Sequence, residues 1–116
     1  MNVFVNKSLH FVKIIFRIIK SPSFITLSVI GNSVVTFFAV LIYMAEAGAN
    51  PRIQSFLDAI WWAFATTTTI GYGDVVPVTS LGKIIGIFLM LIGVAIFSIY
   101  TALFARAILD DDTYMQ

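Results

Sequence analysis

The chain has 116 residues, of which 59% are hydrophobic and 11% are charged. Soluble domains carry about 25% charged residues, so this composition excludes an ordinary soluble protein and indicates a single membrane-embedded domain. The chain has no cysteine and one histidine, which excludes disulfides and thiolate metal sites. Since its carboxylates are predicted near the membrane faces, it also offers no set of side chains from which to build an enzyme active site.

Residues 1–20 predict an amphipathic helix that lies in the membrane interface. Apolar side chains fill the stretch "FVNKSLHFVKIIFRIIK", and polar or basic residues recur in it every three or four positions: Asn6, His10, Lys13, Arg17 and Lys20. Such a stripe favours anionic lipid at the inner membrane surface, weakly and in a salt-dependent manner. Two functions remain open for this segment: a cuff coupled to a gate farther along the chain, or a simple membrane anchor.

Two later stretches are long enough to cross a bilayer. Residues 21–45 form a run of 25 residues without a charge, and residues 84–105 form a run of 22. At ~1.5 Å per residue, either run exceeds the ~30 Å of hydrocarbon as a helix. We predict an outer transmembrane helix over 22–46 and an inner transmembrane helix over 81–109.

The basic residues predict the orientation of these helices. Arg52 and Lys83 lie in the connection between the spans, whereas the other five flank the spans on the side of the chain ends: Lys7, Lys13, Arg17, Lys20 and Arg106. Under the positive-inside rule, this distribution predicts a multi-pass protein of the cell membrane with both termini in the cytoplasm.

A shorter apolar stretch, "SFLDAIWWAFATT" at 55–67, lies between the spans. A helix of this length reaches only ~20 Å, so we predict a re-entrant helix that enters the membrane from outside and stops near mid-membrane. Ser55 and Asp58 resemble a capping box at its start, and the Asn50-Pro51 pair breaks the chain just before it.

The polar stretch "TTTTIGYGD" at 66–74 follows this short helix. The chain must return from mid-membrane to the outer face, so we predict extended backbone, which membranes tolerate only inside protein or beside water. Several copies around a symmetry axis would enclose it. Gly71 and Gly73 permit the mirror-image backbone angles that turn successive carbonyls to one side. A monovalent cation, potassium or sodium, would then bind the Thr69 hydroxyl and the carbonyls of Thr69, Ile70, Gly71 and Tyr72.

This motif resembles the signature of potassium channels. The stretch "LDAIWWAFATTTTIGYGDVVPVT" is similar to the pores of voltage-gated potassium channels, prokaryotic ones in particular, and the likeness runs from about Phe56 to Arg106. It implies an ion-channel pore domain over 21–116, a homotetramer, and K⁺ as the permeant ion. The filter residues that it implies are Thr68, Thr69, Ile70, Gly71, Tyr72, Gly73 and Asp74.

The sequence departs from this family at a position that bears on the filter. Some prokaryotic relatives pair a Glu of the short helix with the Asp after the filter, but this chain has Ala65 there. The partner left for Asp74 is the indole of Trp61, from the same or a neighbouring subunit. Together with Trp62, these two residues are expected to support the filter. Voltage-gated relatives carry further transmembrane helices, and the sequence leaves open whether it is a piece of such a protein.

The inner helix is predicted to line a cavity below the filter. Residues at spacings of three and four define the lining face: Val94, Phe97, Thr101 and Ala105. Residues 105–109 would form its narrowest part. Gly93, midway along this helix, is either a gating hinge, as in the family, or a small residue that permits close helix packing. Gly82 and Gly86 fit packing alone, and Glu46 at the outer membrane edge is expected to be solvated or paired structurally.

We therefore predict an all-α membrane protein with two transmembrane helices, a re-entrant pore helix and an extended selectivity filter, assembled as a four-fold tetramer. The predicted function is passive, potassium-selective conduction in contact with membrane lipids, without nucleic acid, small-molecule substrate or catalysed reaction. The alternatives are a weakly selective monovalent cation channel and a non-conducting membrane scaffold or regulatory subunit. The threonines and alternating glycines argue against a scaffold, which would have no use for them.

Overall fold

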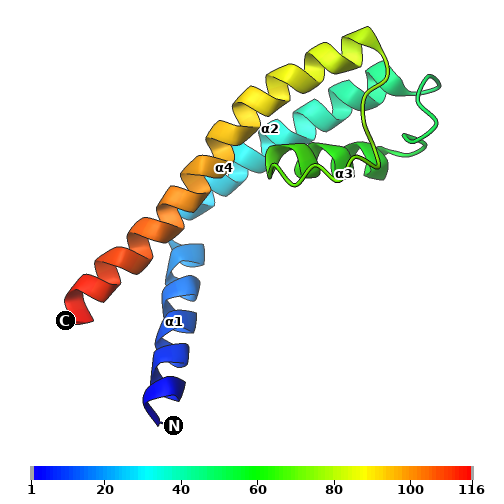
Figure 1. Cartoon of the computed structure of the whole chain (residues 1–116). Helices are drawn as coiled ribbons and strands as arrows, with labels where there is room; N and C mark the ends of the chain where they lie inside the picture. Colours follow the sequence, from blue (N-terminus) through cyan, green and yellow to red (C-terminus); the bar gives the residue numbers. More distant parts are fainter. Residues whose placement is uncertain (1, 116) are drawn as a thin grey trace. The chain divides into compact units, whose positions relative to one another are not determined.

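The structure, a computed structural model, describes the backbone of residues 2–115 and the side chains of residues 2–110. The described residues form four helices (Figure 1): α1 (Asn2–Lys20), α2 (Pro22–Glu46), α3 (Phe56–Thr67) and α4 (Ser80–Met115). Over this range the chain has no β-strand, which confirms the predicted all-α class. Met1 and Gln116, the outer ends of the predicted segments 1–20 and 21–116, lie outside the described residues.

Two of these helices are long and apolar enough to cross a membrane. The best windows have a mean hydropathy of 2.1 in Pro22–Glu46 and 2.5 in Ser80–Asp110. Ser21 fixes the start of the first one. Its hydroxyl donates to the carbonyl of Ile18 at 2.7 Å and accepts from the Phe24 amide at 3.2 Å, while Pro22 occupies the first helical position, where no amide is needed.

The helix ends differ from the predicted bounds in two places. The short helix begins at Phe56, and Ser55 is its N-cap, so the predicted start at 55 was one residue early. The inner helix was predicted over 81–109 but runs from Ser80 to Met115. It continues because no glycine or proline follows Gly93, and because Arg106 and Asp110, one turn apart, form an ion pair at 3.8 Å.

The chain divides into two compact units. The first, here called the central unit, consists of residues 30–97, and the second, the terminal unit, consists of residues 1–29 and 98–116. Both α2 and α4 contribute residues to each unit. This division cuts across the predicted segments 1–20 and 21–116, because the first third of α2 and the last part of α4 belong with α1.

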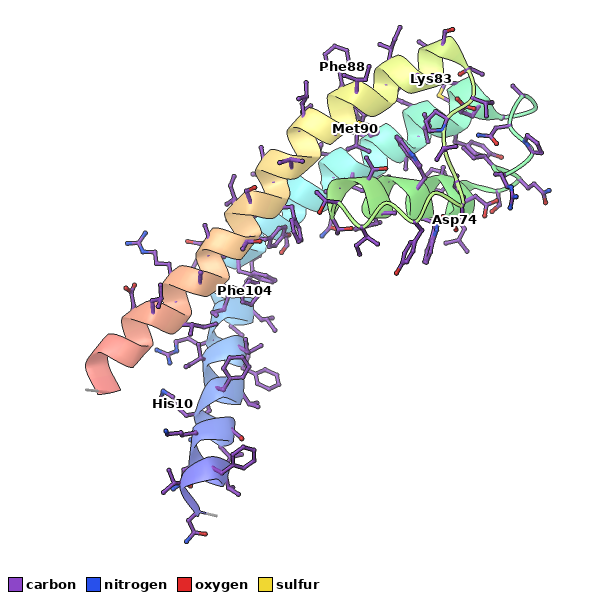
Figure 2. The ribbon with its side chains drawn as sticks, viewed as in Figure 1. His10, Asp74, Lys83, Phe88, Met90 and Phe104 are labelled. Atoms are coloured by element: carbon purple, nitrogen blue, oxygen red, sulfur yellow. The ribbon has the colours of Figure 1, made fainter. Side chains whose placement is uncertain are left out.

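The core of the central unit lies where α2, α3 and α4 meet (Figure 1). Its fully buried members include Ala39 and Ile42 of α2, Ala59 of α3 and Leu89 of α4. The other side of α4 is left uncovered within the unit, and Figure 2 shows Phe88 pointing away from α2 and α3. A transmembrane helix with one packed face and one exposed apolar face is suited to contact lipid or other chains.

The terminal unit is held together by a smaller set of contacts. Ile14 and Ile18 of α1 are 3% and 4% exposed. The ring of Phe24 on α2 meets those of Tyr100 and Phe104 on α4 edge to face, at centroid distances of 5.7 and 5.8 Å. The Tyr100 hydroxyl donates a hydrogen bond of 2.9 Å to Oγ of Ser28, which ties the two apolar helices together.

Candidate functional site

The short helix α3 is anchored at its start by its own acidic residue. Oδ2 of Asp58 accepts hydrogen bonds from the amides of Gln54 at 2.9 Å and Ser55 at 3.1 Å. These amides precede the helix and would otherwise lack a partner. The negative charge also lies in the first turn, where the helix dipole favours it. The sequence signal for this start, Ser55 with Asp58, therefore has a structural counterpart.

The threonine run closes the other end of α3. Thr68 is the C-cap, and its amide and hydroxyl both donate to the carbonyl of Phe64, at 3.0 and 2.7 Å. The amide of Thr69 donates to Thr66, and that of Gly71 donates to Ala65. The last carbonyls of the helix are thus paired with the segment that follows, as in a Schellman-type ending.

The segment after α3 has an alternating backbone. Residues Gly71 and Gly73 have positive φ angles of 58° and 83°, as their spacing predicted, and Thr69 also has a positive φ, of 65°. A branched side chain in this region costs roughly 1–2 kcal/mol. Thr69 follows the helix C-cap, a position that usually holds glycine. This conformation was not predicted, because nothing in a run of four threonines marks which one will be left-handed.

The side chains of this segment lie on the surface of the chain. Ile70 is 58% exposed and Tyr72 is 65% exposed. A cavity of about 210 Å³ is lined by residues of α3 and of the segment together: Trp61, Phe64, Ala65, Thr68, Ile70 and Tyr72. An extended segment that a single chain leaves uncovered is unsuited to lipid, because its backbone polar groups would lack partners there.

Trp61 and Asp74 meet within one chain. Nε1 of Trp61 donates to Oδ2 of Asp74 at 2.9 Å, and the Trp61 ring stacks on Tyr72 with a centroid distance of 5.5 Å and an interplanar angle of 12°. The contact expected for Asp74 is therefore present, on the same subunit. Figure 2 shows Asp74 on the connection between α3 and α4. Trp62 lies elsewhere: it is 4% exposed, in the core of the central unit.

Glu46 organises the chain on the far side of the segment. Its side chain is fully buried, so the expectation that it might be solvated was wrong and the alternative, a structural pairing, is confirmed. The carboxylate accepts hydrogen bonds from the amide of Val78 at 3.1 Å, and from the amide and hydroxyl of Thr79 at 3.0 and 2.8 Å. Charged acceptors make stronger hydrogen bonds than neutral ones.

Asn50 and Gly82 complete this arrangement, which we call the Glu46 anchor. Nδ2 of Asn50 donates to Glu46 at 3.1 Å and to the carbonyl of Val76 at 2.8 Å. A Cβ atom on Gly82 would collide with Oε1 of Glu46, so glycine leaves room for the carboxylate. A sequence signal existed: a glutamate ends a transmembrane helix, and a Thr-Ser-Leu-Gly turn opens the next.

The inner-helix residues singled out from the sequence fall into two groups. Val94 and Phe97 of the central unit are 47% and 39% exposed, and Thr101 and Ala105 of the terminal unit are also exposed. Gly93 differs, because it is buried within an uninterrupted helix, and a Cβ there would lie 3.0 Å from Cα of Thr67. The packing role of Gly93 therefore has a contact behind it, while the hinge role stays a prediction.

One polar group at this contact lacks a partner. Oγ1 of Thr67 is buried and accepts or donates no hydrogen bond among the described residues. Elsewhere in the described chain, histidine, aspartate and glutamate side chains form no group of three that could hold a metal ion. Any ion bound in the segment 69–72 would therefore rely on backbone and hydroxyl oxygens.

Comparison with known proteins places these features in context. Residues 29–110 match the sequence model of a family described as "Ion channel". A voltage-gated potassium channel of Aeropyrum pernix is 52% identical over 62 residues, which are 53% of this chain and 21% of that protein. The human potassium voltage-gated channel subfamily KQT member 4 is 40% identical over 79 residues, 68% of this chain and 11% of that protein.

A solved structure gives the same result in three dimensions. The pore module of a voltage-gated K⁺ channel, captured in a closed state in lipid membranes, superimposes with a TM-score of 0.53 at 34% identity, over 66% of this chain and 84% of that module. The chain thus spans about a fifth or less of the two full-length relatives but most of the isolated pore module. These likenesses confirm the resemblance seen in the motif "TTTTIGYGD".

Proposed function

The chain belongs to the ion channel family, and from this premise we propose that it forms a potassium-selective pore through which K⁺ moves passively down its electrochemical gradient. The alternating backbone of residues 69–73 is the single observation that carries the proposal. Positive φ angles at every second residue turn neighbouring carbonyls to a common side. A row of neutral oxygens of this kind replaces the hydration shell of a monovalent cation.

The proposed ion sites use the carbonyls of Thr69, Ile70, Gly71 and Tyr72 and the hydroxyl of Thr69. The backbone strain at Thr69 supports a role for its side chain. Glycine at this helix end would avoid the unfavourable φ of 65°, and strained residues of this kind gather at functional sites. Preference for potassium over sodium is supported by the likeness to proteins named as potassium channels.

The pore requires more than one copy of the chain, and we propose a homotetramer. Four large side chains of the proposed filter and of α3 are 42–65% exposed in the single chain: Ile70, Tyr72, Trp61 and Phe64. Neighbouring copies would cover them and would exclude lipid from the filter backbone. Four-fold symmetry rests on the resemblance to potassium channels, whose filters are built from four such loops.

Trp61 and Asp74 are proposed to support the filter from behind, since one hydrogen bond and one ring stack join α3 to the segment it carries. Trp62 would act through the core that holds α3 in place. Below the filter, Gly93, Val94, Phe97, Thr101 and Ala105 are the proposed cavity and gate residues. We propose that the protein spans the cell membrane and that both termini face the cytoplasm, as the basic residues indicate.

Flux from liposomes tests the proposal against a non-conducting scaffold. The purified full-length chain is reconstituted into vesicles loaded with K⁺, and release is followed with and without barium, a blocker of potassium pores. Barium-sensitive release supports the pore. Its absence in a preparation whose protein mass in detergent matches four chains of 12.8 kDa would favour the scaffold. A mass that matches one or two chains would contradict the tetramer itself.

A further inference from the structure

A buried hydroxyl near the end of α3 has no hydrogen-bond partner among the described residues. Thr67 is only 5% exposed, and its Oγ1 forms no hydrogen bond there. Because this atom is already enclosed within one chain, a neighbouring copy cannot pair with it while the helices keep their places. A buried polar group without a partner lowers the stability of a fold, and native proteins contain few of them. Thr67 is therefore a costly residue in the described conformation.

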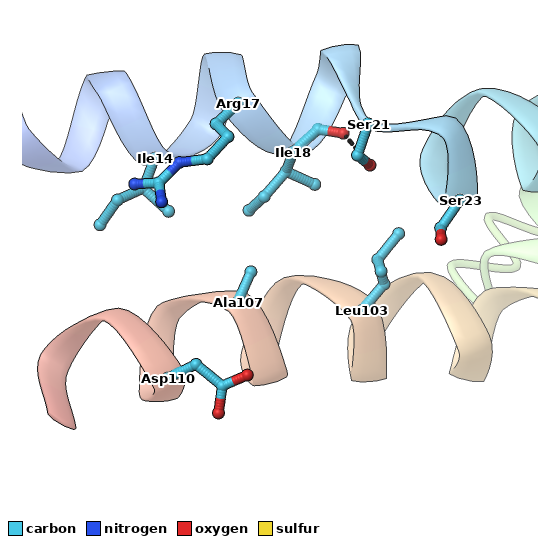
Figure 3. A pocket seen from close by; sticks show the side chains of 8 residues that line it. All are labelled: Ile14, Arg17, Ile18, Ser21, Ser23, Leu103, Ala107 and Asp110. Atoms are coloured by element: carbon cyan, nitrogen blue, oxygen red, sulfur yellow. Dashed lines mark hydrogen bonds between the residues drawn. The ribbon is translucent and has the colours of Figure 1, made fainter. Parts of the chain in front are cut away.

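Two other hydroxyls show how this chain satisfies such groups locally. Figure 3, a view into the cavity at the end of α1, shows the Ser21 hydroxyl on the carbonyl of Ile18, to which it donates at 2.7 Å. The Thr68 hydroxyl donates to the carbonyl of Phe64, four residues back, at 2.7 Å. A threonine within a helix commonly uses this acceptor, but Thr67, the residue before Thr68, does not.

The hydroxyl of Thr67 is turned toward α4 instead. The three atoms nearest to a Cβ built on Gly93 all belong to Thr67: Cα at 3.0 Å, Oγ1 at 3.2 Å and Cβ at 3.3 Å. Since Gly93 has no side chain, the hydroxyl lies directly beside the backbone of α4. Leu89, one turn earlier on the same face, is fully buried. In a continuous helix such as α4, the Gly93 amide donates to the Leu89 carbonyl, so neither group is open to Thr67.

A bend of α4 would change this situation. If α4 bends at Gly93 away from α3, the backbone hydrogen bonds on the side that faces α3 lengthen, and the Leu89 carbonyl separates from the Gly93 amide. Within a membrane each freed group needs a new partner, and threonine side chains of neighbouring helices can provide one. A hydroxyl both donates and accepts, so it can serve the two groups at once. Sharp helix bends are found where a side chain inserts into the backbone ladder in this way.

We propose that the Thr67 hydroxyl stabilises a bent conformation of α4, in which it donates to the carbonyl of Leu89 and accepts from the amide of Gly93. The proposal rests on the hinge role of Gly93 in the proposed pore. It adds the partner that the exposed backbone groups of a hinge require, and it places that partner on the helix that leads into the proposed filter. The unpaired hydroxyl in the described conformation is what this second conformation explains.

The experiment measures the bend as a distance between two spin labels. The chain has no cysteine, so Leu57→Cys on α3 and Leu109→Cys on α4 provide the only labelling sites; the two leucines are 72% and 65% exposed. Leu109 lies ~24 Å beyond Gly93 along the helix, so a bend of about 20° moves its label by about 8 Å. Labelled full-length chains are diluted with unlabelled ones in liposomes, and double electron–electron resonance gives the bent and unbent populations.

Three substitutions are compared in this labelled chain. Thr67→Val keeps the shape of the side chain and removes the hydroxyl, Thr67→Ser keeps the hydroxyl, and Thr66→Val makes the first change one residue earlier. We expect Thr67→Val to lower the ratio of bent to unbent chains by about five-fold, and the other two to change it by less than about two-fold. Equal losses in the two valine variants, no loss in either, or a single distance in the unmodified chain would overturn the proposal.

Two further readouts separate this inference from the proposed function. The thermal midpoint of Thr67→Val should hold or rise, because an unpaired group is removed; a clear fall would overturn the inference, since the hydroxyl would then already have a partner. A bend that depends on Thr67 in a protein without barium-sensitive flux would support the inference and contradict the proposed pore. Barium-sensitive flux without a bent population would do the opposite.

Discussion

The two halves of the connection between α3 and α4 are held in opposite ways. Residues 75–79 are fixed by the Glu46 anchor, in which one buried carboxylate accepts hydrogen bonds from Val78, Thr79 and Asn50. Residues 69–74 have exposed side chains, and within the described part of one chain their side chains form a single hydrogen bond, from Trp61 to Asp74. A single chain thus completes the Glu46 anchor by itself and leaves the side chains of the proposed filter uncovered.

This contrast predicts that damage to the anchor and damage to the filter will have different signatures. Changes at the anchor should lower the stability of the folded chain most, whereas changes at the proposed filter should alter conduction with a smaller loss of stability. The following substitutions are ordered from the largest expected loss of stability to the smallest.

Glu46→Ala should cause the largest loss, because several buried donors lose their acceptor, at about 1–3 kcal/mol for each donor left unpaired. The thermal midpoint of the purified protein in detergent measures the effect. Gly82→Ala should be nearly as harmful, since its Cβ would collide with the carboxylate. In a Glu46→Ala background, Gly82→Ala should cost much less, since the close contact that remains is the one of 2.9 Å between the new Cβ and Oγ1 of Thr79. If the two losses simply add, Gly82 does not act by making room for Glu46.

Gly93→Ala separates a packing role from a hinge role. The new methyl group would lie 3.0 Å from Cα of Thr67, and overpacking of this kind costs about 1–3 kcal/mol. We expect a lower thermal midpoint if Gly93 serves packing. A hinge role predicts the reverse, since alanine favours an unbent helix by up to about 1 kcal/mol over glycine: the midpoint would hold or rise while the open probability changed in bilayer recordings.

Gly73→Ala and Gly48→Ala form a matched pair. Their φ angles are 83° and 82°, and neither position has an atom within 4 Å of a new Cβ. Both substitutions should therefore cost the same strain, about 1–2 kcal/mol. Only Gly73 lies in the proposed filter, so only Gly73→Ala should abolish potassium selectivity or current in single-channel recordings. Equal effects on current would mean that strain alone, and not the position of the carbonyls, explains the result.

Trp61→Phe should have the smallest effect on stability. It keeps an aromatic ring for the stack on Tyr72 but removes the hydrogen bond to Asp74, a loss of about 0.5–1.5 kcal/mol at a site where Trp61 is 49% exposed. The time for which the filter stays conducting should change, and Asp74→Asn should change it in the same sense. Bilayer recordings of both variants decide the matter: inactivation identical to the unmodified protein in both would remove the supporting role.

The sequence predicted the parts of the fold that follow from composition and length. The two spans, the re-entrant helix and the left-handed glycines at 71 and 73 follow from hydropathy, from the reach of a helix and from the φ angles that glycine permits. The Trp61 contact with Asp74 was predicted by elimination of other partners, but the sequence could not choose between one subunit and two.

What the sequence missed depends on tertiary packing. The burial of Glu46 requires α2 and the start of α4 to meet. Only then is it clear that Gly82 leaves room for a carboxylate and not for a neighbouring helix. The left-handed Thr69 is set by the way α3 ends, which a threonine run does not reveal. The cavity beside Arg17 needs three helices at once. None of these has a periodic signature along the chain.

The most direct test of the central claim is the reversal potential of the purified full-length protein in a planar bilayer, with potassium on one side and sodium on the other. We predict a potential close to the potassium equilibrium value, because the carbonyls of residues 69–72 should replace the hydration shell of potassium and not that of sodium. Clear current that reverses near zero would contradict it and would leave a cation pore without selectivity.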